Sequence, residues 1–443
     1  MAGIFKAYDI RGIYPIELNE EIIEKIGKAS ANLRGKDIVI GSDVRKSSPS
    51  LKASLVKGLL SAGAKVTDVG SITTPMMIFA TANYGFDLGM IITASHNPPQ
   101  YNGIKFFERG GIGMTYESGV CQIEKIVNEA DRKEEPIKGE LKSRDIYEDY
   151  RKFLLKNLRI KKAPMKIVVD CFNGADSLIA PLVLSDLGAE VVKIRCSFNG
   201  DFPESGPDPS QDGNLELLKQ AVLKEKADLG FAYDGDGDRL AVVGSNGNPI
   251  ETKIVFSFLI EGAPRGSKVI YEVLTSNTVV DTIKKNGGFP IVCRVGHTYI
   301  GEKLLKEKAA LAGEISGHFF FKEIFGGDDA LYASLKVLET MIEKKINLDK
   351  YASGYPKSFF ETRRVLIKES EKLNFIENLK SDFSKSANID TLDGVKIFFE
   401  TGWAVFRPAN TEPKISIAYE SSNKEEFEKI VGMVEKIISK IPQ

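Results

Sequence analysis

Hydrophobic residues occur in short runs that repeat in the same order along most of this chain. Each repeat begins with an apolar run of strand length, passes through a stretch with apolar residues at helical spacing, and reaches a glycine typical of a helix end before a second apolar run. The paired runs are 38–41 with 63–66, 166–170 with 188–192, and 268–271 with 287–292. Alternating strands and amphipathic helices predict three similar mixed α/β domains with largely parallel sheets.

A third apolar run follows in every repeat, and each one leads into an unusual polar loop. These loops are Thr93-Ala94-Ser95-His96-Asn97-Pro98, Asp234-Gly235-Asp236-Gly237-Asp238-Arg239 and Gly313-Glu314-Ile315-Ser316-Gly317-His318. Sheets of this kind bind ligands outside the carboxyl ends of their strands. All three loops are therefore expected at binding positions.

The last part of the chain has a different pattern. Residues 395–399, 402–407 and 414–419 alternate like paired strands, and apolar spacing predicts helices over 370–386 and 424–440. This combination is typical of a small α+β domain. The domains expected from these patterns are residues 1–150, 151–250, 251–360 and 361–443.

Composition and charge exclude some classes of partner. Hydrophobic content of 42% and charged content of 27% are those of an ordinary globular protein. Lysine and arginine total 60 against 61 acidic residues, so no basic surplus indicates nucleic acid or an anionic membrane. The N-terminus lacks the apolar region of a signal peptide, and stretches such as 254–260 are too short to span a bilayer.

Cysteine usage points to a reducing compartment. The four cysteines are widely separated in the sequence and form no C-x-x-C pair. They are Cys121, Cys171, Cys196 and Cys293. A reduced, cytoplasmic protein is the expected setting.

Three aspartates alternate with glycines in the second polar loop. Asp234, Asp236 and Asp238 can converge on one cation if the backbone curls, and Gly235 and Gly237 permit that curl. A solvated acidic turn is the alternative, but three carboxylates after an apolar strand need a neutralising charge. Hard oxygen ligands suit Mg²⁺, so the loop is interpreted as a Mg²⁺ site.

Ser95 ends a buried-strand pattern, and Pro98 turns the chain shortly after it. A serine in a turn is commonly a cap or a hydrogen-bonding residue. His96 adjoins Ser95, but the chain around it is not a G-x-S-x-G elbow. Beside a Mg²⁺ loop at the equivalent edge of the next repeat, phosphoryl transfer through Ser95 becomes the favoured interpretation.

The three histidines of the chain all lie near expected strand ends. A lone histidine is usually structural, but the shared location of His96, His297 and His318 favours contact with a ligand. Glu314 and Ser316 stand two positions apart, so their side chains can point the same way and bind sugar hydroxyls.

The loop Arg407-Pro408-Ala409-Asn410-Thr411-Glu412-Pro413 joins two expected strands of the tail. Arginine offers a bidentate fork for phosphate, and Asn410, Thr411 and backbone amides can supply further donors. A proline-rich hairpin turn is the alternative. The sequence G-x-x-x-x-G-K-[ST] does not occur in the chain, so this is not a Walker A loop.

Taken together, these loops resemble those of the α-D-phosphohexomutase family, most closely its phosphomannomutase/phosphoglucomutase branch. TASHNP is similar to the family's phosphoserine loop, DGDGDR to its metal loop, GEISGH to its sugar-binding loop and RPANTEP to its phosphate-binding loop. The N-terminal segment Phe5-Lys6-Ala7-Tyr8-Asp9-Ile10-Arg11-Gly12 also resembles a segment lining the family's active site. The order and spacing match over nearly the whole chain, which implies four domains around a central cleft.

The resemblance implies a role for each matching residue. Ser95 would be the phosphorylated serine, and its phosphate would complete a Mg²⁺ site made by Asp234, Asp236 and Asp238. The transferring phosphoryl group would be surrounded by Arg11, Lys105 and Arg239, and Lys105 or His318 would be the general acid or base. The residues expected to contact substrate are Tyr8, His297, His318, Glu314, Ser316, Arg407, Asn410 and Thr411.

The implied reaction interconverts the 1-phosphate and 6-phosphate of mannose or glucose through a hexose 1,6-bisphosphate. Small sugar phosphates are thus the expected partners, with no nucleic acid and no membrane. Phosphoglucosamine mutase is an alternative within the family, although that branch tends to have glutamine where Ile315 stands. A non-catalytic sugar-phosphate binding protein and a metal-dependent phosphatase are alternatives from other classes.

The chain departs from the family pattern at three positions. Ala409 stands where serine is usual, Ser416 where arginine is frequent, and Ser42 where arginine is common. The first two remove donors from the expected phosphate site. None of the three removes a residue of the expected catalytic set.

Overall fold

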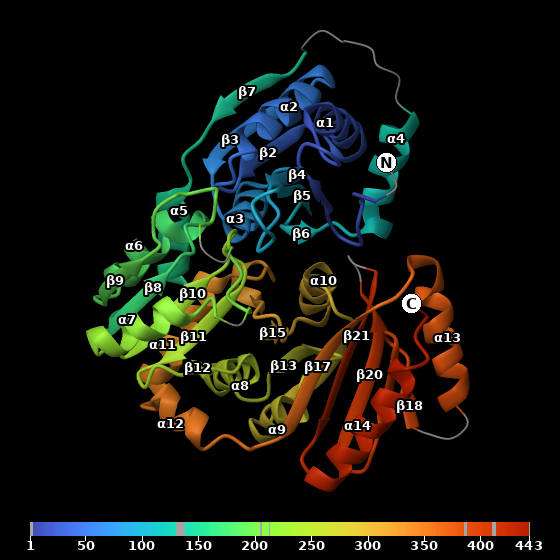
Figure 1. Ribbon diagram of the computed structural model, residues 1–443. Helices are drawn as coiled ribbons and strands as arrows, with labels where there is room; N and C mark the ends of the chain where they lie inside the picture. Colours follow the sequence, from blue (N-terminus) through green and yellow to red (C-terminus); the bar gives the residue numbers. More distant parts are fainter. Residues whose placement is uncertain are drawn as a thin grey trace.

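The computed structural model describes residues 3–129, 138–203, 206–211, 213–384, 388–409 and 413–442. Within these residues, the strands form four sheets that follow one another along the chain. Figure 1 shows the corresponding parts arranged in an arc, from blue through green and yellow to red. Each helix in the described ranges is too short or too polar to cross a membrane.

The first sheet has parallel strands and an antiparallel edge. In order, its strands are β1 (Ile10–Ile13), β5 (Tyr101–Glu108), β4 (Leu88–Ile92), β2 (Asp37–Ser42), β3 (Lys65–Ser71) and β7 (Glu140–Ser143), and β6 (Ile112–Gly113) pairs with β5. β5 is antiparallel to both β1 and β4, whereas β4, β2, β3 and β7 run parallel. The helices of this part are α1 (Glu20–Arg34), α2 (Ser48–Ser61), α3 (Thr74–Tyr84) and α4 (Cys121–Glu129).

The second sheet follows helix α5 (Tyr147–Lys156). In order, its strands are β12 (Pro249–Ile250), β11 (Leu240–Gly244), β10 (Leu229–Tyr233), β8 (Lys166–Asp170) and β9 (Glu190–Ile194). Its helices are α6 (Ala180–Asp186) and α7 (Glu216–Glu225).

The third sheet is built in the same way. In order, its strands are β14 (Phe289–Cys293), β13 (Lys268–Glu272), β15 (Leu311–Gly313) and β16 (Phe319–Phe321). Its helices are α8 (Thr252–Gly262), α9 (Asn277–Lys285), α10 (His297–Glu307), α11 (Ala330–Lys344) and α12 (Leu348–Ser353).

The three sheets share a core of parallel strands in one spatial order. This core is β3-β2-β4, β9-β8-β10 or β14-β13-β15, and each core continues into an antiparallel strand, β5, β11 or β16. The three polar loops are the connections β4–β5, β10–β11 and β15–β16, so they leave equivalent strand ends. This topology confirms the expected repeat of mixed α/β domains.

The fourth sheet is antiparallel. In order, its strands are β17 (Phe359–Leu366), β21 (Lys414–Ser421), β20 (Gly402–Pro408), β19 (Val395–Phe398) and β18 (Asn388–Asp390), with helices α13 (Lys372–Phe383) and α14 (Lys424–Ile438). The expected α+β tail is confirmed. The domain boundaries stay predictions, and the one expected at residue 360 lies inside β17, a strand that the pattern did not reveal.

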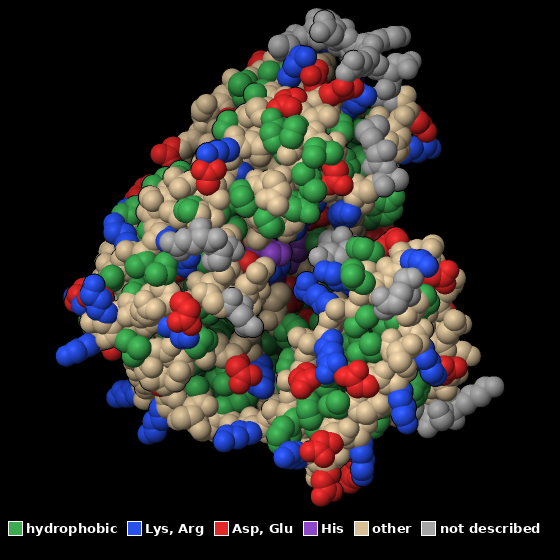
Figure 2. All heavy atoms as spheres, in the orientation of Figure 1, with side chains coloured by type: hydrophobic (Ala, Val, Ile, Leu, Met, Phe, Trp, Pro, Cys, Tyr) green, Lys and Arg blue, Asp and Glu red, His purple; other side chains and the backbone are tan. Residues whose placement is uncertain are grey.

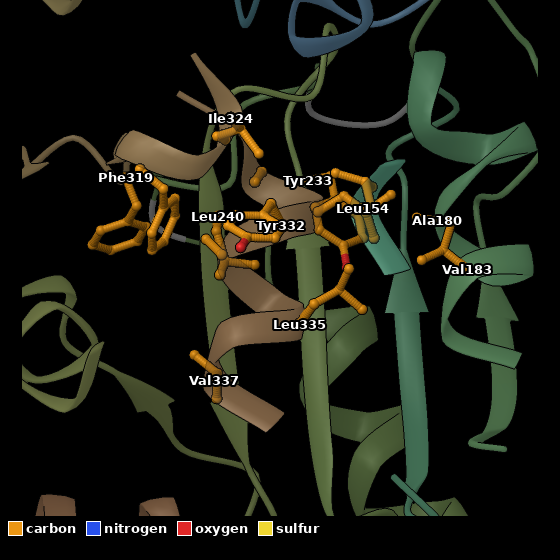
Figure 3. Close-up of a cluster of buried hydrophobic side chains, with 14 of the residues drawn as sticks. Leu154, Ala180, Val183, Tyr233, Leu240, Phe319, Ile324, Tyr332, Leu335 and Val337 are labelled. Carbon is orange, nitrogen blue, oxygen red and sulfur yellow. The ribbon is translucent and has the colours of Figure 1, made fainter. Parts of the chain in front are cut away.

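A shared hydrophobic core joins the second and third parts. In Figure 3, Tyr332 and Leu335 of α11 lie beside Tyr233 at the end of β10, and all three belong to one buried cluster. The Tyr233 hydroxyl lies 2.9 Å from the Ser334 hydroxyl, which satisfies both groups inside the cluster. α11 therefore fixes the second sheet against the third, and with it the loops that leave both sheets.

Candidate active site

Most of the expected site residues line one cleft between the four parts. The cleft has a volume of about 530 Å³, and Figure 2 shows histidine side chains in the hollow at the centre of the molecule, with lysine and arginine nearby. The expected residues that line it are Tyr8, Arg11, Ser95, Lys105, Arg239, His297, Glu314, Ser316, His318 and Arg407. Segments far apart in the sequence thus meet around one space large enough for a small ligand.

Ser95 lies just beyond β4 in a constrained conformation. Its φ angle is +50°, in the left-handed region that side chains rarely adopt. Its backbone N–H donates to the Thr93 hydroxyl at 2.9 Å, and its own hydroxyl donates to Oδ2 of Asp234 at 2.7 Å. Strain of this kind is found where the surrounding structure fixes a functional residue.

The loop 93–98, called the serine loop here, is fixed by Arg45. Sequence reasoning did not place this residue in the site. The Arg45 side chain is fully buried and forms an ion pair with Asp43 at 3.0 Å. Its guanidinium also donates to four backbone carbonyls, at 2.6–3.0 Å, which belong to Ser95, Asn97, Pro98 and Tyr101. One arginine therefore fixes the course of the backbone through the whole loop.

The three aspartates of the loop 234–239, called the metal loop here after the role expected for it, lie close together. Asp234, Asp236 and Asp238 are all 0% exposed, and each offers an oxygen within 4.8 Å of the others. Oδ1 of Asp236 is buried without a hydrogen-bond partner. An orphaned buried oxygen amid three carboxylates is what a hard cation such as Mg²⁺ would satisfy, so the residues fit this metal.

The glycines of the metal loop allow close backbone contact. A Cβ atom at Gly235 would lie 2.7 Å from the carbonyl oxygen of Ser95, so the serine loop and the metal loop pack with no space for a side chain. Gly237 has a φ angle of +79°, which glycine adopts without strain. The alternation of aspartate and glycine thus follows from both packing and backbone conformation.

Backbone hydrogen bonds from three parts of the chain fix the metal loop. Thr74 at the start of α3 donates to the carbonyl of Asp236 at 2.8 Å, and Ala175 donates to that of Gly235 at 3.0 Å. Ala330 at the start of α11 donates to the carbonyl of Gly237 at 3.2 Å. Residues from the first three domains therefore contribute jointly to the position of this loop.

Burial and like charge make the metal loop electrostatically unfavourable without a cation. Burial raises the pKa of Asp234 well above its usual value, and the charges of Asp238 and Asp236 raise it further. The Lys105 ammonium lies 2.7 Å from Asp236 and 2.6 Å from Asp238. Burial lowers the pKa of Lys105, but these two carboxylates outweigh it and the net shift is upward.

His318 forms a second charged cluster at the edge of the metal loop. Its Nε2 lies 3.1 Å from Asp238, and its Nδ1 lies 2.9 Å from Glu314. Burial lowers the pKa of His318, but the two carboxylates raise it to about 10, so the imidazole is protonated at neutral pH. Ser316 donates to Glu314 at 3.0 Å, which places the expected sugar-binding pair side by side.

His297 is in the opposite electrostatic situation. Burial, followed by the charges of Lys105 and His318, lowers its pKa to about 4, so its ring is neutral at pH 7. Tyr8 lies edge-on to it, with ring centroids 4.6 Å apart. The two rings form an uncharged wall of the cleft.

Arginine side chains approach the serine and metal loops from two sides. Arg11 forms a 2.6 Å ion pair with Asp9 and donates to the Asn97 side chain at 3.1 Å. Arg239 lies with Nε 3.4 Å from His318. Both arginines line the cleft beside Ser95, where a phosphoryl group would need positive charge.

The fourth sheet contributes further positive charge. Arg407 is buried, lines the cleft and contacts Asp393 at 3.0 Å. Asn410 and Thr411 lie outside the described residues. Arg364 on β17 and Lys414 on β21 also line the cleft, although sequence reasoning named neither.

Arg364 lies across from Ser416, one of the three positions at which the chain departs from the expected family pattern. It stands directly across from Ser416 in the pairing of β17 with β21, and Ser416 stands across from Arg407 in the pairing of β21 with β20. Ser416 stands where the resemblance implies a frequent arginine. The neighbouring strand therefore carries an arginine at the level where this one is missing.

Asp328 is another buried carboxylate that sequence reasoning missed. Its Oδ2 lies 3.8 Å from His318 and has no hydrogen-bond partner. Burial and the charge of Asp238 raise its pKa to about 7. The residue follows a Gly-Gly turn rather than the strand end of the repeat, so the sequence pattern gave no signal for it.

Comparisons with known proteins agree with this architecture. Family profiles named phosphoglucomutase/phosphomannomutase match the chain in four consecutive segments: alpha/beta/alpha domain I over residues 2–134, domain II over 148–247, domain III over 252–359, and the C-terminal domain over 364–437.

Similar proteins align over nearly the full chain. A phosphomannomutase/phosphoglucomutase of Pseudomonas aeruginosa is 35% identical, over 97% of this chain and 94% of its own. A probable phosphoglucosamine mutase of Methanocella arvoryzae is 33% identical, over 99% and 98%. The crystal structure of a phosphoglucomutase/phosphomannomutase family protein from Burkholderia thailandensis has a TM-score of 0.89 and 30% identity, over 98% and 96%.

The fold and the cleft define an enzyme of the phosphohexomutase class, which is a class of isomerases. The chain belongs to the phosphoglucomutase/phosphomannomutase family. The resemblance inferred from its four loops is confirmed.

Proposed function

We propose that this protein interconverts hexose 1-phosphates and hexose 6-phosphates through a phosphorylated Ser95 and a hexose 1,6-bisphosphate. The observation that carries the proposal is the 2.7 Å contact between the Ser95 hydroxyl and Asp234, inside a cleft lined by cationic side chains. A phosphate on that hydroxyl would lie among three buried carboxylates and would need a metal to neutralise it.

Asp234, Asp236 and Asp238 would hold Mg²⁺, with a phosphate oxygen of Ser95 completing the set. Bound Mg²⁺ would supply positive charge to the phosphoryl oxygens and neutralise Asp236 and Asp238, which raise the pKa of Lys105; Asp238 also raises that of His318. Arg11 and Arg239 would hold the remaining phosphoryl oxygens. Catalysis in this arrangement is mainly positioning and charge neutralisation.

Proton transfer belongs to Lys105 or His318 in this proposal. When the sugar hydroxyl attacks phosphorus, its proton would pass to Lys105 or His318 as the bond between phosphorus and the Ser95 oxygen breaks. The same group would return a proton to the departing Ser95 oxygen, and the return transfer would reverse these changes. Both groups lie against Asp238, so both sense the charge of the metal loop. Glu314 and Ser316 would orient the sugar hydroxyls, and Tyr8 and His297 would pack along the substrate.

The second phosphate of the bisphosphate needs its own site. Arg407 would hold it, joined by Asn410 and Thr411, and the cationic side chains of Arg364 and Lys414 line the same part of the cleft. The intermediate has to turn over between the two transfers, so this site must accept a phosphate from either end of the sugar. Three cationic side chains together offer donors to a phosphate in more than one position.

Mannose and glucose phosphates are the proposed substrates. Ile315 and the segment Tyr8-Asp9-Ile10-Arg11 favour them over glucosamine phosphate. With these substrates, the similarity to a probable phosphoglucosamine mutase reflects common descent. Phosphoglucosamine mutase remains the second candidate because that relative spans the whole chain.

The test is a substrate panel with purified protein and Mg²⁺. Mannose 1-phosphate, glucose 1-phosphate and glucosamine 1-phosphate are compared by formation of the 6-phosphate. Intact mass detects a phosphate on the protein, and its absence from Ser95→Ala assigns it to Ser95. Turnover of the first two with a phosphate adduct supports the proposal. Dominant turnover of glucosamine 1-phosphate would select the second candidate. Release of inorganic phosphate faster than isomer formation would indicate a phosphatase, and binding without turnover a non-catalytic protein.

A further inference from the structure

Two cysteines that are separated in the sequence lie in contact in the second domain. The sulfurs of Cys171 and Cys196 are 3.1 Å apart. β8 and β9 run parallel with Asp170 level with Ile194, so the residues that follow these strands emerge side by side. Their wide separation in the sequence gave no sign of this contact.

We propose that Cys171 and Cys196 are an oxidation site and form a reversible intramolecular disulfide. A disulfide has an S–S distance of about 2.05 Å, so the two sulfurs need to approach by roughly 1 Å. The backbone around them is already joined, because Asn173 donates to the carbonyl of Arg195 at 2.7 Å. Cys121 on α4 and Cys293 at the end of β14 lie in other domains, so this pair is the one placed to react.

The burial of the two thiols determines which of them is oxidised first. Cys196 is half-buried, whereas Cys171 is fully buried, and burial raises the pKa of the Cys171 thiol. Cys196 is thus the sulfur that meets a peroxide: its thiolate attacks one oxygen, the O–O bond breaks, and a sulfenic acid and water form. The Cys171 sulfur then attacks the sulfenic sulfur and releases a second water. In total, two thiols lose two protons and two electrons, and one peroxide becomes two waters.

The location of the pair gives the disulfide a structural effect. Cys171 begins the turn that contains Gly174 and Ala175, and Ala175 supports the metal loop through its bond to Gly235. A Cβ atom at Gly174 would lie 2.7 Å from the Gly235 carbonyl, so this turn packs directly against the loop. A covalent link at its first residue would hold the turn to the end of β9.

Side-chain contacts fix the ends of β8 and β9 near the two sulfurs. Arg195 forms an ion pair with Asp170 whose side chains are 9% and 0% exposed, and its guanidinium stacks on Phe172 at 3.9 Å. Phe172, Asn173 and Arg195 all have φ angles between +45° and +60°, a cluster of constrained backbone around the two sulfurs. Since both strand ends are fixed by these contacts, bond formation requires little rearrangement.

The test uses the full-length protein in its reduced form, treated with hydrogen peroxide or oxidised glutathione, alkylated under denaturing conditions and measured by mass spectrometry. We expect two of the four thiols to become protected, the mass to fall by two hydrogens, and a peptide carrying Cys171 to be linked to one carrying Cys196. Dithiothreitol should restore all four thiols. The melting temperature should rise by about 5 °C on oxidation, because a disulfide restricts the unfolded chain.

Matched variants separate this site from the other cysteines. The variant Cys196→Ser changes a half-buried residue and should lose both the protection and the thermal shift. The variant Cys121→Ser should keep both. Cys171→Ala tests the same pair if the serine variant folds poorly. Four thiols that stay free, a link that involves Cys121 or Cys293, or direct conversion of Cys196 to a sulfinic acid would overturn the proposal. None of these readouts depends on mutase activity.

Discussion

The hydroxyl of Ser95 donates a 2.7 Å hydrogen bond to Asp234, a residue 139 positions further along the chain. The two residues leave equivalent strand ends of neighbouring sheets, and Gly235 brings their loops into backbone contact. The hydroxyl that we propose as the nucleophile and a candidate metal ligand thus share one hydrogen bond. This geometry is what a phosphorylated serine with a neighbouring cation requires.

Replacing Ser95 with alanine should abolish mutase turnover. The substitution removes the oxygen that we propose carries the phosphoryl group, and we expect kcat to fall by at least about a thousandfold. The far-ultraviolet circular dichroism spectrum should be unchanged, because the hydroxyl contributes little to the core. Ser50→Ala, at an exposed serine of α2, is the matched control. Retained turnover in Ser95→Ala would exclude a phosphoserine mechanism.

Removal of divalent cations should stop turnover, and Mg²⁺ should restore it. Metal and protons compete for Asp234, whose pKa is raised, so Mg²⁺ should bind more weakly as the pH falls. Isothermal titration calorimetry at about pH 6 and about pH 8 measures this trend, and binding should release protons. Asp236→Asn should weaken Mg²⁺ binding at both values. Full activity after exhaustive chelation would contradict the metal assignment.

Arg45→Gln should destabilise the protein and misplace Ser95. The change breaks a fully buried ion pair and leaves Asp43 without its countercharge, for which about 3 kcal/mol or more is typical. Urea unfolding measures this loss. Intact mass measures the fraction of the protein that is phosphorylated. This fraction should fall more than the folded fraction does, because the carbonyls of the serine loop also lose their donor. A variant that is unstable but normally phosphorylated per folded molecule would assign Arg45 a purely structural role.

Arg364→Gln should raise KM with little change in kcat. Arg364 lines the cleft at the level of Ser416 and Arg407, where we place the non-reacting phosphate. Loss of one charged hydrogen bond predicts a KM roughly tenfold higher. Arg363→Gln is a close control, because Arg363 contacts Glu361 and Glu435 and does not line the cleft. Equal effects of the two substitutions would argue against a phosphate contact at Arg364.

Glu272→Gln should flatten the pH dependence of stability. Burial raises the pKa of Glu272 from 4.5 to about 8, so between these values the folded protein holds a proton that the unfolded chain has released. Rising pH through this window therefore favours unfolding of the wild type. Urea unfolding at about pH 5 and about pH 8 gives the unfolding free energy at each pH. The difference between the two values should be smaller in the variant than in the wild type, by on the order of 2 kcal/mol. Parallel curves for the two proteins would show that Glu272 is not buried as a proton-binding group.

The sequence was most informative where a short loop follows a strand of the repeat. Ser95, the three aspartates of the metal loop and Glu314 all leave the third parallel strand of a sheet, so strand periodicity alone placed them on one edge. β17 was missed because its alternating side chains are exposed or half-buried, which gives a weak apolar pattern. Its residue Arg364 was missed with it.

Residues that act through long-range contacts left no local signal. Arg45 reaches four carbonyls about 50 positions away, and the sequence shows only a polar turn there. Cys171 and Cys196 meet only because two strands run parallel, and a spacing of 25 residues does not by itself indicate contact. Asp328 follows a glycine turn outside the repeat. Such relationships depend on the pairing of strands and not on patterns within them.

The three backbone donors to the metal loop, Thr74, Ala175 and Ala330, have a consequence for how the protein can be divided. An excised second domain would carry all three aspartates but only one of these donors, so its loop would be free to relax and its cation affinity should collapse. The first three domains are thus a single working part despite their internal repetition. Gene fragments that separate them would not yield interchangeable modules, whereas the described residues of the fourth domain include no donor to this loop.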